Sequence, residues 1–486
     1  MINIRQKATK GALWSFFGST AAQIIRFGIG IVLARILTPR EYGLVGMLAI
    51  FISVSDALVD SGFGQALIQK KAASKIDFSS VFFLNVIISL FLFLVILIFS
   101  PQIANFFNEP QLELLVIILA AGIIIRSFMV IQNTIFIKAI DFKIISAYRI
   151  LSIICSGLIA IPMALKGYGV WSLVALTLTQ NATYTFALWF KSPWKPNWQF
   201  SYSSIKELFG FGSRILGIGL LDNIFLHINK LVIGKYFSAT DLGFYNRAYG
   251  YRDLISKNIL MIIQSVVFPT FATFQDDLVR VRSNLRKVSE FSLFITIPML
   301  ALLAFTAEPL IIFLITDKWL PAVPYLQVLC LAGVFYPLSG IQVNILKAIG
   351  KVDVYFRMIL SHKAFIIISI IIAIRWGVMG LVVAQVFNMF FIYFLGVLAI
   401  KKFLNESVLN QLWSVIKYVM IVIVIFYPIH LFINYYFRND LIIILMQSVL
   451  SLSIYYVITS AIKFQGFVEF RRILKEVILP KLKRNK

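Results

Sequence analysis

Apolar stretches of about 20 residues, repeated along the whole chain, constrain this sequence more than any other feature. A helix that crosses the hydrocarbon core of a bilayer needs about 20 apolar residues. Charged residues, proline and glycine separate fourteen such stretches, at residues 11–37, 42–61, 79–99, 112–137, 145–165, 168–190, 208–234, 243–269, 287–315, 322–346, 355–375, 377–400, 411–434 and 440–462. The sequence therefore predicts an all-α polytopic membrane protein with about 14 transmembrane helices.

The composition excludes other classes of protein. Of the 486 residues, 60% are apolar and only 14% are charged, whereas soluble domains carry about 25% charged residues. An ordinary cytosolic enzyme and a disordered chain are both excluded. The net charge of +24 would suggest a nucleic-acid partner in a soluble protein. Here most basic residues lie between apolar stretches, where they set membrane orientation, and we expect no nucleic-acid partner.

Basic residues are distributed unequally between the two predicted sides of the membrane. One side carries 28 Lys and Arg residues and the other carries 7. This asymmetry predicts an even number of spans with both termini in the cytoplasm. The basic segment Met1–Lys10 is followed by an apolar run without a small-residue cleavage site, so it precedes a first span and is not part of a signal peptide. The basic tail is expected to lie along anionic membrane lipids.

Four short segments recur at an offset of about 200–209 residues. Residues 33–43 match 233–243, and the matches continue in the same order at 138–140 with 347–349, 148–150 with 356–358, and 169–174 with 377–382. Parallel six-span repeats are a transporter architecture. We therefore predict two pseudo-symmetric six-helix lobes at 1–190 and 208–403, joined by a cytoplasmic linker at 191–207. Two additional transmembrane helices at 404–463 and a basic cytoplasmic tail at 464–486 follow.

Ten basic residues fall inside the predicted spans. Each would cost about 2.5–3.5 kcal/mol at the bilayer centre, and ten would exceed the net stability of about 5–15 kcal/mol of a typical protein. Arg214, Lys257 and Lys363 are placed to snorkel from helix ends. The others predict a hydrated cationic cavity, for which the candidate substrate-binding residues are Arg26, Arg126, Arg149, Lys230, Arg247, Arg252 and Arg357.

Polar residues at helical spacing support such a cavity. Gln23 and Arg26 belong to one polar stripe of the first span, which also contains Ser15, Ser19 and Gly30. The residues predicted to line the cavity are Gln23, Asn133, Asn223, His227 and Tyr249. For any single residue, an interhelical hydrogen bond is an equal alternative to ligand contact. For His227, a hydrogen-bonded interior position is the better interpretation than a proton site.

A cationic cavity is suited to an anionic cargo. Arginine makes bidentate charge-assisted hydrogen bonds to phosphate. Candidate residues for coupling transport to H⁺ or Na⁺ are Asp60, Asp222 and Asp253, although such carboxylates could equally neutralise basic neighbours. No cofactor and no metal site are expected, because the two cysteines and three histidines are scattered. No plausible catalytic base or metal site is present, so we do not expect an enzyme.

Two segments resemble a known family. These are Leu33-Ala34-Arg35-Ile36-Leu37-Thr38-Pro39 with Gly43, and Asp60-Ser61-Gly62-Phe63-Gly64-Gln65-Ala66-Leu67-Ile68-Gln69. They are similar to the polysaccharide transporter family of Wzx-type flippases, within the multidrug/oligosaccharidyl-lipid/polysaccharide exporter superfamily. Looser similarity extends over roughly residues 8–403.

The resemblance implies a bacterial inner-membrane flippase without enzymatic activity. Such a protein moves undecaprenyl-diphosphate-linked oligosaccharide units to the periplasmic leaflet by alternating access, for O-antigen, capsule or exopolysaccharide biosynthesis. A polysaccharide polymerase and glycosyltransferases are candidate partners. Three alternatives stay open: a cation-coupled multidrug exporter, a membrane sugar-polymer ligase or glycosyltransferase, and a non-transporting scaffold. The positive charge of the predicted cavity argues against export of cationic drugs.

Overall fold

The computed structural model describes residues 4–273 and 277–473, and every secondary-structure element of the described part is a helix. Fourteen of its described helices have 22 residues or more, which confirms the predicted all-α membrane fold. Within these described residues, eleven helical stretches are long and apolar enough to cross a membrane, and some of them contain more than one helix. The chain divides into two compact units, residues 1–243 and 244–486, whereas the predicted lobe boundary at 191–207 stays a prediction.

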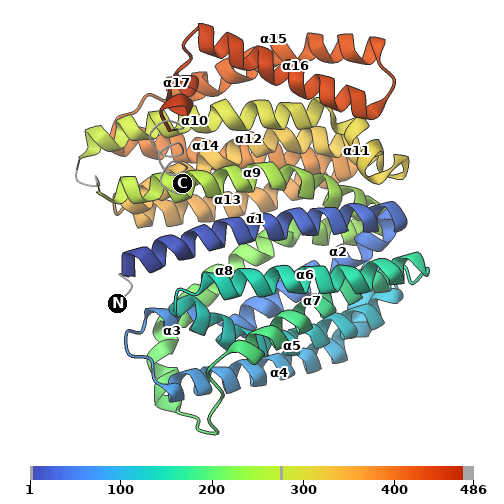
Figure 1. Ribbon diagram of the computed structural model, residues 1–486, viewed down its shortest axis with the longest axis vertical. Helices are drawn as coiled ribbons and strands as arrows, with labels where there is room; N and C mark the ends of the chain where they lie inside the picture. Colours follow the sequence, from blue (N-terminus) through green and yellow to red (C-terminus); the bar gives the residue numbers. More distant parts are fainter. Residues whose placement is uncertain (1–3, 274–276, 474–486) are drawn as a thin grey trace. The chain divides into compact units, whose positions relative to one another are not determined.

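The first unit contains eight helices in its described residues (Figure 1). They are α1 (Ile4–Ile36), α2 (Pro39–Asp60), α3 (Phe63–Gln69), α4 (Lys75–Phe107), α5 (Gln111–Lys138), α6 (Phe142–Leu165), α7 (Val170–Lys191) and α8 (Tyr202–Tyr236). Helix α1 packs on α6, which packs on α7, and α8 packs on α2, α3 and α4. Helix α8 begins six residues earlier than the predicted span, because Ser201 caps its first turn by accepting from the Ser204 amide at 3.2 Å.

The second unit begins within α9 (Ala239–Thr273). It continues with α10 (Leu278–Phe305), α11 (Ala307–Ile315), η1 (Asp317–Trp319), α12 (Ala322–Ala348), α13 (Val352–Ala373), η2 (Ile374–Trp376), α14 (Gly377–Leu404), α15 (Val408–Tyr436), α16 (Asp440–Ala461) and α17 (Gln465–Ile473). The single span predicted at 287–315 is two helices, because the chain breaks at Thr306. Within the predicted tail, α17 packs against α10.

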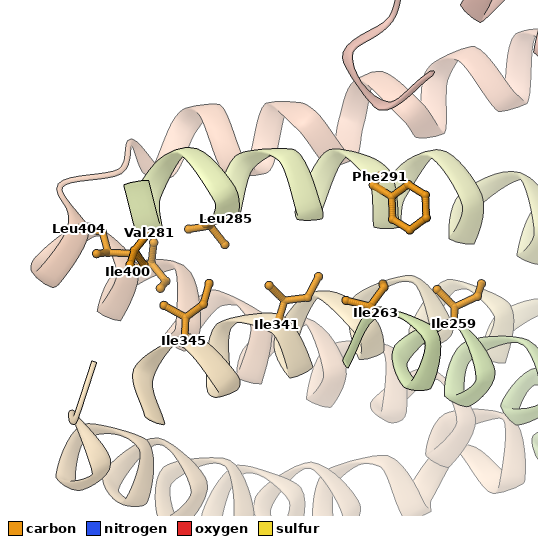
Figure 2. Close-up of a cluster of buried hydrophobic side chains, with 9 residues drawn as sticks. All are labelled: Ile259, Ile263, Val281, Leu285, Phe291, Ile341, Ile345, Ile400 and Leu404. Carbon is orange, nitrogen blue, oxygen red and sulfur yellow. The ribbon is translucent and has the colours of Figure 1, made fainter. Parts of the chain in front are cut away.

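Aliphatic and aromatic side chains from α9, α10, α12 and α14 form one core of the second unit (Figure 2). Leu285 projects from α10 toward Ile341 and Ile345 of α12, and Phe291 projects toward Ile263 of α9. Each of these side chains is less than a tenth exposed. Because lipid tails are as apolar as these side chains, close van der Waals packing, rather than removal from water, holds the four helices together where they lie in the bilayer.

The sequence repeat appears again as repeated local structure. At the start of α2, the Thr38 amide donates to Glu41 Oε2 at 2.6 Å. At the start of α9, the Ser238 hydroxyl donates to Asp241 Oδ2 at 2.6 Å and accepts from the Asp241 amide at 3.0 Å. Both are capping arrangements that satisfy backbone groups at a helix start. The glycines before α7 and within the start of α14, Gly169 and Gly377, also share a left-handed backbone, with φ of 54° and 70°.

Two matched glycines of the repeat allow a close backbone contact within the first unit. A Cβ atom added at Gly43 would lie 1.6 Å from the carbonyl oxygen of Ala239, and one added at Gly243 would lie 1.9 Å from that of Pro39. The start of α2 therefore touches the start of α9 reciprocally, backbone against backbone. Only glycine permits such an approach at both positions.

A buried carboxylate ties the link between α14 and α15 to α10. Glu406 is 2% exposed and accepts from Arg282 Nε at 2.6 Å and from Arg286 Nε at 2.8 Å. Both arginines stay partly solvated, at 35% and 46% side-chain exposure, which reduces the energy of the pairs.

A second ion pair lies in the first unit, outside the spans. There the hydrogen bond from Lys70 to Glu207 raises the pKa of the Lys70 amine above its ordinary value.

We expect Glu406→Gln to lower the free energy of unfolding by about 1–2 kcal/mol, because two guanidinium groups lose their shared counter-charge. The measurement is thermal unfolding of the purified protein in detergent. Glu207→Gln is the matched control, since Glu207 is 63% exposed and contacts Lys70. Equal melting temperatures for the two variants would contradict the structural role of Glu406.

Candidate functional site

Two arginines of the predicted set interact within the first unit. The guanidinium groups of Arg26 on α1 and Arg149 on α6 interact electrostatically. Arg149 also interacts with the Tyr184 side chain on α7, and the Tyr184 hydroxyl donates to Asn133 Oδ1 on α5 at 3.0 Å. A chain of contacts thus leads from two like charges to a polar amide on a fourth helix.

A cavity of about 550 Å³ lies in the same unit. It is lined by residues of α2, α3, α5 and α8 and by Gly62. Four residues predicted from the sequence line it: Asp60, Arg126, Asn133 and Asn223. Its volume falls within the range of about 300–1,000 Å³ that is typical of small-molecule sites. The cavity therefore brings together predicted residues as far apart in the sequence as Asp60 and Asn223.

The charged side chains of this cavity are paired. Arg126 Nη1 lies 2.5 Å from Asp56 Oδ2, and the two side chains are 37% and 17% exposed. Asp60 lies one helical turn after Asp56 on α2 and also lines the cavity. The lining thus contains one arginine and two aspartates, so its formal charge is not positive.

A sharp bend between α2 and α3 shapes one wall of the cavity. Ser61 and Gly62 both have left-handed backbones, with φ of 50° and 68°. A Cβ atom at Gly62 would lie 2.4 Å from the Gly212 carbonyl oxygen of α8, and one at Gly64 would lie 3.0 Å from Asp60 Oδ1 and 3.1 Å from Thr134 Oγ1. The glycines of this motif therefore bring α8 close and leave room for the polar side chains.

The basic residues of α9 are placed differently, inside the second unit. Arg252 is 3% exposed, lies 3.2 Å from Asp253 Oδ1 and stacks on the Tyr249 ring at 4.6 Å. Lys257 Nζ lies 2.5 Å from Asp253 Oδ2. Arg247 lies over the Trp319 ring at 5.3 Å. These contacts give Arg252 and Asp253 a structural role in the packing of α9, and they favour the alternative in which the aspartate neutralises its basic neighbours.

The remaining predicted residues lie on helix surfaces. Gln23 is partly buried on α1, and Arg357 is exposed on α13. Asp222 is exposed on α8, whereas His227 and Lys230 are partly buried there. Among the described residues no group of three His, Cys, Asp or Glu side chains is arranged to hold a metal ion. The cargo-binding, ion-coupling and cofactor assignments stay predictions.

Three contributors to this region are not among the site residues predicted from the sequence. Asp56, the partner of Arg126, stands four residues before Asp60 on α2, and that spacing places both on one helix face. Gly64 could be singled out from the sequence only because it belongs to the segment that resembles the family. Tyr184 could not be singled out, because its link between Arg149 and Asn133 depends on the packing of α5, α6 and α7.

A second polar cavity, of about 200 Å³, lies in the second unit between α10, α12, α14, α15 and α17. Its buried Glu290 accepts hydrogen bonds from Ser414 Oγ and from the Tyr418 hydroxyl, each at 2.7 Å. The Tyr418 hydroxyl accepts from the Gly466 amide at 3.0 Å. These bonds attach α17 to α15 and α10, so the polar groups of this cavity are mainly engaged in holding helices together.

The fold and the polar cavity define a polytopic α-helical membrane protein with a ligand-sized internal site. A family model described as "Polysaccharide biosynthesis protein" matches residues 32–324. The chain belongs to this family. It is 27% identical over 362 residues to the teichuronic acid biosynthesis protein TuaB of Bacillus subtilis, covering 73% of this chain and 74% of the relative.

The chain is also similar to another relative and to one solved structure. The chain is 24% identical over 430 residues to the lipopolysaccharide biosynthesis protein WzxC of Escherichia coli, covering 85% of each. The structure of the lipid II flippase MurJ in an inward closed conformation aligns with a TM-score of 0.73 at 18% identity, covering 93% of this chain and all of that one. The latter likeness shows a shared fold.

Proposed function

We propose that this protein is a flippase that moves undecaprenyl-diphosphate-linked oligosaccharide units across the bacterial inner membrane for surface polysaccharide biosynthesis. The observation that carries the proposal is the pair Arg26 and Arg149, two guanidinium groups that interact electrostatically and belong to two helices long and apolar enough to cross a membrane. Like charges at membrane depth repel each other and are costly. An anionic ligand with two phosphates relieves both costs, and the family of the chain acts in polysaccharide biosynthesis.

Transport follows from the chemistry of such a ligand. The diphosphate docks on Arg26 and Arg149 by charge-assisted hydrogen bonds, and alternating access then exposes it to the other leaflet. Differential affinity for the two states is required for any coupling ion. H⁺ or Na⁺ binding at Asp60 or Asp222 is our proposal for that coupling. Both termini lie in the cytoplasm, in keeping with the distribution of 28 and 7 basic residues.

Reconstitution tests the proposal directly. Purified protein in proteoliposomes should transfer an undecaprenyl-diphosphate-linked oligosaccharide from the outer to the inner leaflet, as measured by loss of access to an external glycosidase. Protein-free vesicles are the control. Equal rates with and without protein would contradict flippase activity.

The chemical fate of the cargo separates the flippase from a membrane ligase or glycosyltransferase. A flippase breaks no covalent bond, so the lipid-linked oligosaccharide should be recovered unchanged by mass spectrometry after transfer. A shortened or extended glycan would favour the enzyme instead. The polymerase and glycosyltransferases that handle the same cargo are the partners we propose.

A further inference from the structure

We propose that the cavity of the first unit is a sugar subsite, which binds the glycan of the cargo and not its diphosphate. The inference rests on the proposed function. It divides the cargo between two places. The phosphates bind at Arg26 and Arg149, and the sugar that is attached to the phosphates binds at Asp60, Asn133 and Asn223. Four observations support this division.

The charge of the cavity disfavours phosphate. Its charged lining residues are Arg126, Asp56 and Asp60, and Arg126 is held by Asp56 at 2.5 Å. A diphosphate placed here would meet two carboxylates and one already paired guanidinium. Burying an anion beside like charges without a free counter-charge costs several kcal/mol. A neutral polyhydroxylated ligand carries no such penalty.

The lining has the chemistry that sugars require. Carboxylates accept, and carboxamides both donate and accept, so each can engage hydroxyl groups of a sugar ring. Thr134 and Ser53 add hydroxyls, although each already donates to a carbonyl of its own helix, at 2.8 Å and 3.2 Å. Met129 and Ile215 supply apolar surface for the C–H faces of a ring. Asn223 is also positioned, because its Nδ2 donates to the Gly219 carbonyl at 2.8 Å.

A chain of side-chain contacts leads from the arginine pair to the cavity. Arg149 contacts Tyr184, Tyr184 donates to Asn133 Oδ1 at 3.0 Å, and Asn133 lines the cavity. The Tyr184 bond fixes the orientation of the Asn133 amide and leaves its Nδ2 hydrogens for a ligand. This chain of contacts links the place proposed for the diphosphate, at Arg149, to the cavity at Asn133.

The size of the cavity fits a short glycan. At about 550 Å³ it exceeds the second polar cavity, of about 200 Å³, whose Glu290 is already bonded to Ser414 and Tyr418. Gly64 contributes to this room, because any side chain there would approach Asp60 and Thr134. The first-unit cavity is thus the better candidate for specificity toward the sugar.

Binding of defined lipids tests the subsite without relying on transport. The probes are sugar-free undecaprenyl diphosphate and four versions carrying one sugar: glucose, galactose, N-acetylglucosamine or N-acetylgalactosamine. Dissociation constants are measured with the purified full chain in detergent. We expect at least one sugar to tighten binding by the wild-type protein about tenfold or more. If none of the four binds more tightly than the sugar-free lipid, the proposal is overturned.

Variants of the cavity then test whether the tighter binding of the sugar-bearing lipid depends on the cavity residues. Asp60→Asn, Asn133→Ala and Asn223→Ala should each weaken binding of the preferred sugar lipid about tenfold, as expected for one lost hydrogen-bonding group, and change binding of the sugar-free lipid less than twofold. Gly64→Ala, which narrows the cavity beside Asp60 and Thr134 and removes no polar group, should act in the same direction and covers the case in which a polar variant fails to fold. Gln102→Ala, at an exposed amide on α4, is the matched control.

The outcomes distinguish the two proposals. If cavity variants weaken both kinds of lipid equally, or neither, the sugar subsite is wrong while flippase activity in proteoliposomes is unaffected by that result. If the sugar-dependent gain depends on the cavity but reconstituted protein transfers no lipid, the flippase proposal fails and the subsite stands. Arg149→Gln should weaken both lipids, since it acts on the diphosphate.

Discussion

The double variant Arg26→Gln/Arg149→Gln should lose at least 99% of transport. Each guanidinium contributes a charge-assisted hydrogen bond to phosphate, worth about 1.5–3 kcal/mol, and each 1.4 kcal/mol is a factor of ten. We therefore expect each single variant to lower the initial rate of transfer about tenfold or more. The rates are measured in proteoliposomes that contain equal amounts of wild-type and variant protein.

Two controls make this result specific to the arginine pair. Arg375→Gln removes the same charge at an exposed position in η2 and should leave the rate unchanged. Arg149→Lys keeps the charge but loses the planar fork, so it should retain part of the rate. A double variant that transports normally would show that the diphosphate docks elsewhere, and it would remove the main support for the proposed function.

The helices and the repeat were predictable because both depend on local sequence. Apolar length alone gave fourteen spans, and fourteen long helices are present in the described residues. The matched segments also share their helix caps. Thr38 bonds to Glu41 at the start of α2, and Ser238 bonds to Asp241 at the start of α9. The break at Thr306 and the early start of α8 were missed, because they depend on single residues within otherwise apolar or polar runs.

The candidate site was only partly predictable, because a sequence shows which charges lie in spans but not which charges meet. Arg126 and Arg149 look equivalent in the sequence. In the fold, Arg126 is paired with Asp56, whereas Arg149 contacts Tyr184 and interacts with Arg26. Arg252 is a third case, buried against Asp253 and Tyr249. The three arginines differ in their side-chain partners, and these partners are set by the tertiary structure.

Alanine at Gly43 should destabilise the protein strongly, although alanine normally stabilises a helix interior relative to glycine by about 1 kcal/mol. The added Cβ would lie 1.6 Å from the Ala239 carbonyl oxygen, so the starts of α2 and α9 would have to move apart. Overpacking of this kind costs about 1–3 kcal/mol, and more where backbone must shift. We expect the melting temperature in detergent to fall by about 5 °C or more.

Gly28→Ala is the matched control, because a Cβ atom at Gly28 on α1 would meet no atom within 4 Å; its melting temperature should stay the same or rise. Gly243→Ala should resemble Gly43→Ala, since its Cβ would lie 1.9 Å from the Pro39 carbonyl oxygen. The two substitutions strain one contact, so their effects should not add. Once the first has forced the helix starts apart, the second meets less resistance. A fully additive double variant would mean that the two glycines act independently, and that the reciprocal contact does not hold the starts of α2 and α9 together.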